Sequence, residues 1–268
     1  MEFQNINANH SATDIDLALC RAALYSTLAI GFQAPTAENL SRLLTEEGKS
    51  SLTITADMLY PARQPDLLSL IHDFPNADAD CTMAFSSRYR ALFGHTASGA
   101  VPPYETEYGN EALFQQPQEL GDLMGFYRAF GLTLKSGMRE RPDHVSCECE
   151  FLMFLALKEA YALEHDNQEM LAETRKAEKL FLRDHLARFL PTFAAKLNGE
   201  DPSGFYGTMV ELCHRFVMAE CARLQVPSGA ANLGLRPADD SRVPMACRSG
   251  TECEAMPGAC VPEGADSV

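Results

Sequence analysis

A chain of 268 residues with 46% hydrophobic and 22% charged residues has the composition of a globular protein that can build a sizeable core. Its formal net charge of −15 argues against nucleic acid and anionic membrane surfaces as partners, because both are negatively charged themselves. The length predicts one large domain, or one domain with a tail, and the charge favours a basic partner such as a cationic peptide.

The first residues carry no targeting or membrane-spanning signal. They lack a basic stretch, and Asp14 and Asp16 interrupt any apolar run. No run long enough to cross a bilayer follows. We therefore expect a cytoplasmic protein without stable membrane insertion, whose nine cysteines are thiols or metal ligands rather than disulfides.

Apolar residues recur at helical spacing from about Asp14 to Gln225, and no stretch alternates apolar and polar residues over a useful length. The sequence therefore predicts an all-α fold: a single helical bundle of roughly eight to ten helices, in two halves that meet near residues 132–144. Residues 1–13 are expected to form a flexible N-terminus and residues 14–226 the helical domain. Besides the helix that starts near Asp14, the pattern predicts helices over residues 35–48, 66–74, 81–94, 117–132, 149–163, 177–199 and 203–224.

Single residues set several expected helix boundaries. Gly48 should end the second helix, Pro117 suits the first position of a helix, and Ser203 is the expected N-cap of the last helix. Pro191 should kink or split the helix over residues 177–199, because proline lacks the N–H that an interior position needs.

The composition changes after Val226, since residues 227–268 contain five prolines, five glycines and no aromatic residue. Such a segment buries too little apolar surface to fold, so we expect a flexible, disordered tail. Its cysteines, Cys247, Cys253 and Cys260, fit no standard zinc or iron–sulfur spacing. Three alternatives are open for these cysteines: a soft-metal site, redox chemistry, or no functional role.

The stretch MRERPDHVSCECEF, residues 138–151, places polar residues before an apolar helix. Pro142 suits a first helical turn, Asp143 can cap free N–H groups, and His144 would then point out from that turn. The same helix start can line a pocket, where Glu140, Asp143 and His144 would offer polar contacts to a ligand. An acid–base role for His144 is the weaker hypothesis, since no nucleophile elbow, phosphate loop, HExxH or dinucleotide motif accompanies it.

Two further features have competing interpretations. The loop VPPYETEYGN, residues 101–110, either packs its tyrosines on the helical body or forms a wall for a peptide, with Glu105 and Glu107 attracting cationic side chains. Cys147 and Cys149 make a poor metal site, because residues two apart on a helix point about 200° apart. We expect structural thiols, with Cys149 in the core and Cys147 nearer the surface.

Several segments, in this order, resemble the TorD/DmsD/NarJ family of redox-enzyme maturation chaperones. They are PPYETEYG, LGDLMGFYRAFGL, ERPDHVSCECEFLMFL, FLRDHLARFLPTFAAKL and FYGTMVELCHRFVMAE, and they extend over roughly residues 15–224. The resemblance implies a cytoplasmic all-helical chaperone, not an enzyme, that binds the apo-form of a molybdoenzyme catalytic subunit of the dimethyl sulfoxide reductase type. It also implies binding of that enzyme's twin-arginine signal peptide, help with molybdopterin cofactor insertion, and delay of export until assembly is complete.

The resemblance also assigns candidate client-binding residues, through an E-P-D-H-type motif and a Y-E-x-x-Y element. The matching residues are Tyr104, Glu105, Tyr108, Glu140, Pro142, Asp143 and His144. Arg141 varies the usual spacing of the first motif. Because that motif is associated with peptide or nucleotide binding, transient contact with molybdopterin or GTP is expected rather than a stably bound cofactor. The expected state is a monomer or a domain-swapped dimer.

Two features depart from the family pattern. The chain has no tryptophan, so Phe85, Tyr89 and Phe93 are candidates to replace the aromatic groove residues of relatives. The cysteine-containing tail lies outside the common core. It motivates an alternative function, an assembly factor that carries a metal or redox equivalents on Cys247, Cys253 and Cys260.

Overall fold

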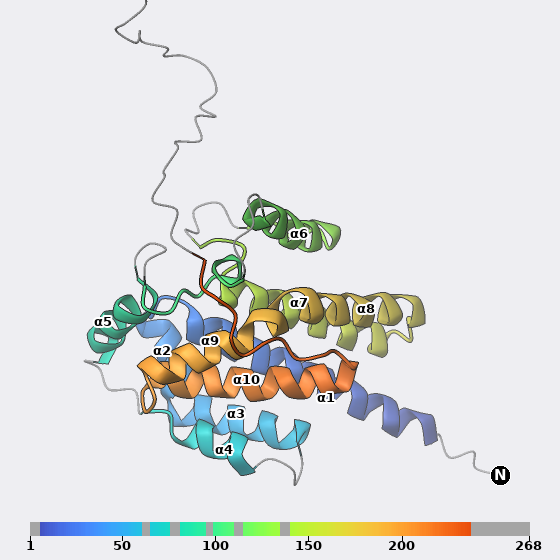
Figure 1. The fold of residues 1–268 in the computed structure, drawn as a ribbon. Helices are drawn as coiled ribbons and strands as arrows, with labels where there is room; N and C mark the ends of the chain where they lie inside the picture. The colour runs from blue at the N-terminus through green and yellow to red at the C-terminus, as the bar shows by residue number, and fades with distance from the viewer. Residues whose placement is uncertain are drawn as a thin grey trace, which may run out of the picture. The chain divides into compact units, whose positions relative to one another are not determined.

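Ten α-helices and one short 3-10 helix make up the part of the chain that the computed structural model describes, which is residues 6–60, 65–75, 81–94, 99–109, 115–134 and 140–236. Within these ranges there is no strand, only two isolated β-bridges, and the all-α prediction is confirmed. In chain order the elements (Figure 1) are α1 (Ile6–Phe32), α2 (Ala37–Leu44), α3 (Glu46–Leu59), α4 (Pro65–His72), α5 (Cys81–Phe93), η1 (Glu105–Glu107), α6 (Gln115–Ala129), α7 (Val145–Glu164), α8 (Gln168–Asp184), α9 (Leu186–Glu200) and α10 (Phe205–Leu224).

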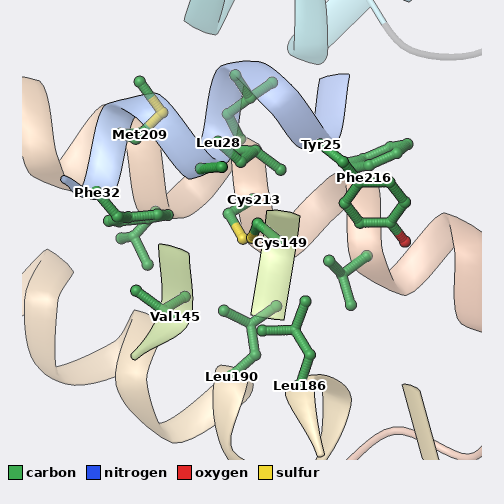
Figure 2. Close-up of a cluster of buried hydrophobic side chains, with 14 of the residues drawn as sticks. Tyr25, Leu28, Phe32, Val145, Cys149, Leu186, Leu190, Met209, Cys213 and Phe216 are labelled. Carbon is green, nitrogen blue, oxygen red and sulfur yellow. The ribbon is translucent and has the colours of Figure 1, made fainter. Parts of the chain in front are cut away.

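One hydrophobic core joins helices from both predicted halves. α1 packs most extensively against α7, and it also contacts α3 and α10, while α9 lies against α10. In Figure 2, Leu28 and Phe32 of α1 lie on one side of Cys149 of α7, and Leu186 and Leu190 of α9 lie on the other. The two halves were expected to meet near residues 132–144. Because α1 precedes these residues and α7 follows them, the two halves share a single core.

No membrane-spanning run was predicted, but α1, alone among the described helices, has the length and composition to cross a membrane, over residues 13–32. Half of that window is buried inside the fold, where Leu24 and Leu28 have no exposed surface. A helix with one face buried in this way is typical of a protein core. The pattern predicts a start near Asp14, but α1 begins at Ile6, since extending a formed helix into polar residues is easy once it has nucleated.

The helix predicted over residues 35–48 is two helices. α2 ends at Leu44, and the Thr45 hydroxyl caps α3 by accepting a hydrogen bond from the Gly48 N–H at 3.2 Å. Gly48 therefore lies in the first turn of α3 and does not end a helix. The sequence signal was misleading because a threonine cap and a glycine stop both fit this stretch.

Two other helix starts also differ from the prediction. α6 begins at Gln115, so Pro117 is its third residue, still in the first turn where no intrahelical N–H is needed. α10 is capped by Asp201, whose carboxylate accepts from the Tyr206 N–H at 3.1 Å, and not by Ser203. A side chain four residues before the helix reaches its first turn because the intervening residues form a turn.

The helix predicted over residues 177–199 breaks at His185, between α8 and α9, and continues through Pro191. Proline leaves the carbonyl four residues earlier without its intrahelical partner. That carbonyl, on Ala187, accepts a hydrogen bond from the Gly229 N–H at 3.1 Å instead. A segment distant in sequence therefore lets α9 tolerate an interior proline.

The segment that does this, residues 226–236, follows α10 and packs back on the body, and we call it the C-terminal strap. Thr192 donates to the Ala230 carbonyl at 2.8 Å and accepts from the Leu233 N–H at 2.9 Å. The predicted tail boundary at Val226 is thus too early, because hydrogen bonds to the body hold these residues and Leu233 packs against the core. The rest of the predicted tail, with Cys247, Cys253 and Cys260, lies outside the described residues.

Gly229→Ala should detach the strap from α9. A Cβ there would lie 2.1 Å from the Arg188 carbonyl oxygen and 2.5 Å from that of Ala187, so the backbone would have to move. We expect the free energy of unfolding to fall by about 2 kcal/mol, measured by chemical denaturation. Gly199→Ala is the matched control, since a Cβ there meets nothing within 4 Å and alanine favours a helix. Equal effects of the two changes would contradict this role of Gly229.

Candidate functional site

The two predicted motifs meet as short pieces of extended chain ahead of α7. Tyr104 and His144 form an antiparallel bridge, and the Glu105 N–H donates to the Asp143 carbonyl at 2.8 Å. η1 is thereby held against the start of α7, and we call this contact between residues 104–107 and 140–144 the junction. Two stretches that are far apart in sequence thus form one structural unit.

Asp143 holds the junction together from a fully buried position. One carboxylate oxygen accepts from the Thr106 hydroxyl at 2.7 Å, and Arg141 contacts both oxygens at 3.0 Å and 2.7 Å. Arg141 also reaches Glu107 at 3.0 Å and lies over the Tyr104 ring, 4.4 Å from its centroid. Asp143 therefore does not cap α7, and Arg141, which varies the family spacing, is central to the junction.

His144 is the residue that caps α7. Its Nδ1 accepts from the Ser146 N–H at 3.1 Å, which assigns the ring proton to Nε2. Burial, with a smaller effect of Arg141, lowers the pKa of His144 to about 3, so the ring is neutral. Its Nε2 is buried without a hydrogen-bond partner in the described structure and lies 3.8 Å from the Glu140 carboxylate.

Stability should fall with acidification because of His144. In the unfolded chain its pKa is about 6.5, and in the folded chain about 3, so the folded state binds fewer protons between these values. The stabilisation is complete above about pH 6.5 and is lost as the pH falls, by up to about 1.4 kcal/mol per pH unit. His144→Asn keeps a capping acceptor and removes the titration. Denaturation at several pH values between 7 and 4 should give a shallower slope for this variant, and identical slopes would contradict the assignment.

Pro142 lies in the turn before α7, not in its first helical turn, because α7 begins at Val145. The Pro142 carbonyl accepts from the Tyr127 hydroxyl at 2.8 Å. This bond connects the junction to α6. Because His144 is the N-cap of α7, Pro142 and Asp143 lie before the helix.

Glu105 extends the junction to α9 from a fully buried position. One of its oxygens accepts from Arg188 at 3.1 Å and 2.7 Å, and the other lies 3.1 Å from Nδ1 of His185. Glu148, in the first turn of α7, is also fully buried, and neither carboxyl oxygen has a hydrogen-bond partner in the described structure. Burial, reinforced by Glu105, raises the pKa of Glu148 well above its usual range, which favours the neutral acid.

The seven predicted client-binding residues divide by exposure. Fully buried are Glu105, Tyr108, Asp143 and His144. Partly exposed are Tyr104, Glu140 and Pro142. Only the second group can touch a partner directly in this conformation, while the first group holds the backbone of the junction in place. Tyr108, for example, donates to the Pro102 carbonyl at 2.8 Å and packs against Phe189.

An apolar groove with a volume of about 250 Å³ lies beside the junction. It is lined by Tyr127, Leu132, Thr133, Leu134, Cys147, Glu150, Phe151, Met153 and Phe154. Tyr127 belongs both to the groove and to the junction, because its hydroxyl holds Pro142. This groove was not predicted. Phe151 and Phe154 are apolar residues of α7 that do not share the face of Cys149, and they were the available signal.

The cysteines of α7 are both buried, Cys149 completely and Cys147 with 6% of its surface exposed, where it lines the groove. Cys147 is therefore nearer the surface than Cys149, as predicted. Burial raises the pKa of the Cys147 thiol to about 12. A hydrogen bond with Cys213, together with burial, raises the pKa of the Cys149 thiol, and Figure 2 shows the two sulfur atoms facing each other. Across the described residues, no group of three His, Cys, Asp or Glu side chains could hold a metal ion.

The aromatic residues proposed to replace tryptophan face the core instead of a groove. Tyr89 and Phe93 are buried and pack edge-on against Tyr206, with ring centroids 5.9 Å and 5.3 Å away. Phe85 packs against Phe205 at 5.2 Å. Helical spacing alone cannot distinguish a core face from a groove face, which explains the error.

Comparison with known proteins adds an independent finding. Residues 59–195 match a family described as "Nitrate reductase delta subunit". The chain is 30% identical over 210 residues to the perchlorate reductase assembly chaperone protein of Dechloromonas aromatica, which covers 76% of this chain and 90% of that one. It is 24% identical over 204 residues to the chaperone protein TorD of Vibrio cholerae, covering 75% and 90%. It is 41% identical over 83 residues to the selenate reductase assembly chaperone protein of Thauera selenatis, covering 31% and 42%.

Proposed function

Because this chain belongs to the nitrate reductase delta subunit family, the TorD/NarJ group of redox-enzyme maturation chaperones, we propose that it is the assembly chaperone of a molybdenum-dependent reductase and not an enzyme. Its client is the apo-form of a catalytic subunit of the dimethyl sulfoxide reductase type, in the cytoplasm. The chaperone holds that subunit ready for molybdopterin insertion and retains its twin-arginine signal peptide until assembly is complete. The observation that carries the proposal is the 30% identity, over most of both chains, to a perchlorate reductase assembly chaperone.

The groove beside the junction is a suitable binding site for the signal peptide. Such a peptide joins a cationic head to an apolar stretch, and aromatic walls such as Phe151 and Phe154 suit the apolar part. Glu150 in the groove and Glu140 at the junction add negative charge nearby. The net charge of −15 steers the cationic head toward the protein, and this contribution weakens with salt whereas apolar burial does not.

Two titrations of the purified protein test the proposal, one with a twin-arginine signal peptide and one with the apo-form of a reductase catalytic subunit. If the protein binds neither the peptide nor the apo-subunit, the proposal is wrong. Phe154→Ala should weaken peptide binding about tenfold, as expected for an anchor in a groove. Leu157→Ala is the matched control, because Leu157 is 44% exposed on the same helix and does not line the groove. Equal losses for both variants would argue against the groove as the peptide site.

A further inference from the structure

Arg236, in the C-terminal strap, enters the candidate site. The Arg236 guanidinium forms a two-pronged ion pair with Glu119 of α6, with N–O distances of 2.8 Å and 3.0 Å. It also donates to the Thr106 carbonyl at 2.6 Å, and its backbone N–H donates to the Glu107 carbonyl at 2.9 Å. Arg236 is only 9% exposed, so η1 and α6 almost enclose it.

The surroundings of Arg236 are shaped for an arginine in extended chain. Leu235 forms an antiparallel bridge with Tyr108, and the Gly109 N–H donates to the Gly234 carbonyl at 2.9 Å. A Cβ at Gly109 would lie 2.8 Å from an Arg236 nitrogen, so glycine leaves the room that the guanidinium needs. Main-chain pairing with an added strand, combined with a planar fork on a carboxylate, is a common way to bind an extended peptide.

The strap is held in a manner that permits exchange. It attaches through separate hydrogen bonds and buries little apolar surface, and Leu235 remains 40% exposed. Segments with few buried apolar contacts open at lower free energy than the core. The paired partner, Glu119, keeps 17% of its side chain exposed and can therefore accept another guanidinium when Arg236 leaves.

The Arg236 site and the apolar groove lie on one helix. Glu119 and Tyr127 are both in α6, eight residues apart, which corresponds to about 12 Å along the axis. An extended peptide spans about 12 Å with roughly four residues. One peptide can therefore place an arginine against Glu119 and an apolar side chain in the groove at the same time.

We propose that the strap is an intramolecular substitute for the client peptide: Arg236 fills the site formed by Glu119 and the Thr106 carbonyl until an arginine of the signal peptide displaces it. This proposal rests on the proposed function, because it takes the twin-arginine peptide as the displacing ligand. A tethered occupant competes at an effective concentration on the order of mM. A peptide that supplies both an arginine and an apolar stretch can overcome this competition, whereas a cationic peptide without the apolar stretch binds poorly.

Arg236→Ala in the full chain tests the proposal. The probe is a synthetic peptide with two consecutive arginines followed by an apolar stretch, compared with the same peptide carrying two lysines. Arg236→Ala should bind the arginine peptide about tenfold more tightly than the unaltered chain, because the site is then always open. Adding Glu119→Gln to Arg236→Ala should remove this gain and the preference for arginine over lysine. Arg236→Lys, which keeps the charge but loses the fork, should bind with intermediate affinity.

Arg183→Ala is the matched control for loss of one positive charge, since Arg183 is half exposed and pairs with its neighbour Asp184. It should leave peptide affinity unchanged. If Arg236→Ala leaves affinity unchanged as well, while peptide and apo-reductase both bind, the strap proposal is wrong and the chaperone function stands. If no variant binds peptide, the strap proposal is equally wrong, and binding of the apo-reductase alone decides the function. If Arg236→Ala converts a dimer to a monomer at unchanged affinity, the strap serves a second copy, which also overturns the proposal.

Discussion

Glu105→Ala should lower the free energy of unfolding by about 3 kcal/mol, the lower part of the range for breaking a buried ion pair. Glu105 is fully buried and pairs with Arg188 of α9 at 2.7 Å, beside His185 at 3.1 Å. Its removal leaves the Arg188 charge without this partner, although Arg188 keeps 28% of its side chain exposed and regains some water. Urea denaturation followed by circular dichroism measures the loss.

Two further variants separate charge from packing at this position. Glu105→Gln keeps the volume and one acceptor, so it should lose less stability than Glu105→Ala. Glu169→Ala, on the exposed surface of α8, removes a carboxylate that is not buried and should cost less than about 1 kcal/mol, the contribution of an acidic residue in a first helical turn. If Glu105→Ala behaves like Glu169→Ala, the contact between η1 and α9 does not stabilise the fold.

Phe193→Ala should lower the free energy of unfolding by about 3–5 kcal/mol, because truncating a buried phenylalanine removes apolar burial and leaves a cavity. Phe193 has no exposed surface. Its ring contacts Phe32 of α1, Phe93 of α5 and Tyr108 of the η1 loop, with centroids 5.8 Å, 6.4 Å and 6.3 Å away. The variant should therefore also loosen the junction and weaken peptide binding. Thermal or chemical unfolding measures the loss of stability, and a peptide titration measures the loss of binding.

Phe193→Leu retains most of the volume and should recover most of the stability lost in Phe193→Ala. Met83→Ala is the matched control for loss of a large apolar side chain, since Met83 is 83% exposed. A small effect of Phe193→Ala, close to that of Met83→Ala, would mean that the surrounding helices close the cavity without penalty.

The helices could be predicted because an apolar stripe is a local property of the sequence. Cys149, for example, has the spacing of a core residue and is fully buried. Boundaries were less predictable, because they depend on contacts with distant residues. Pro191 should break a helix by every local rule, yet Gly229 supplies the hydrogen bond that its helix lacks.

The sequence drew attention to both motifs of the candidate site but did not predict that they meet. The bridge between Tyr104 and His144 was found only in the structure. The full burial of Asp143 could not be seen in the sequence, because it depends on a loop more than thirty positions away. Thr106 of that loop donates a hydrogen bond to the Asp143 carboxylate. Arg236 was missed because the strap is held by main-chain bonds and carries no apolar pattern.

The pairing of α1 with α7 has a consequence for how the chain folds as it is made. α1 ends at Phe32 and its most extensive partner begins at Val145, so 113 residues (145 − 32) must follow before the two can pack. At roughly 5–20 residues per second, synthesis of these residues takes about 6–23 s, during which α7 cannot cover the apolar face of α1. Through that interval α1, which has the composition of a membrane span, lacks its most extensive partner surface, although α2 and α3 can already pack against it. The core of this chaperone is therefore completed late in synthesis, because it depends on a helix pair that is distant in sequence.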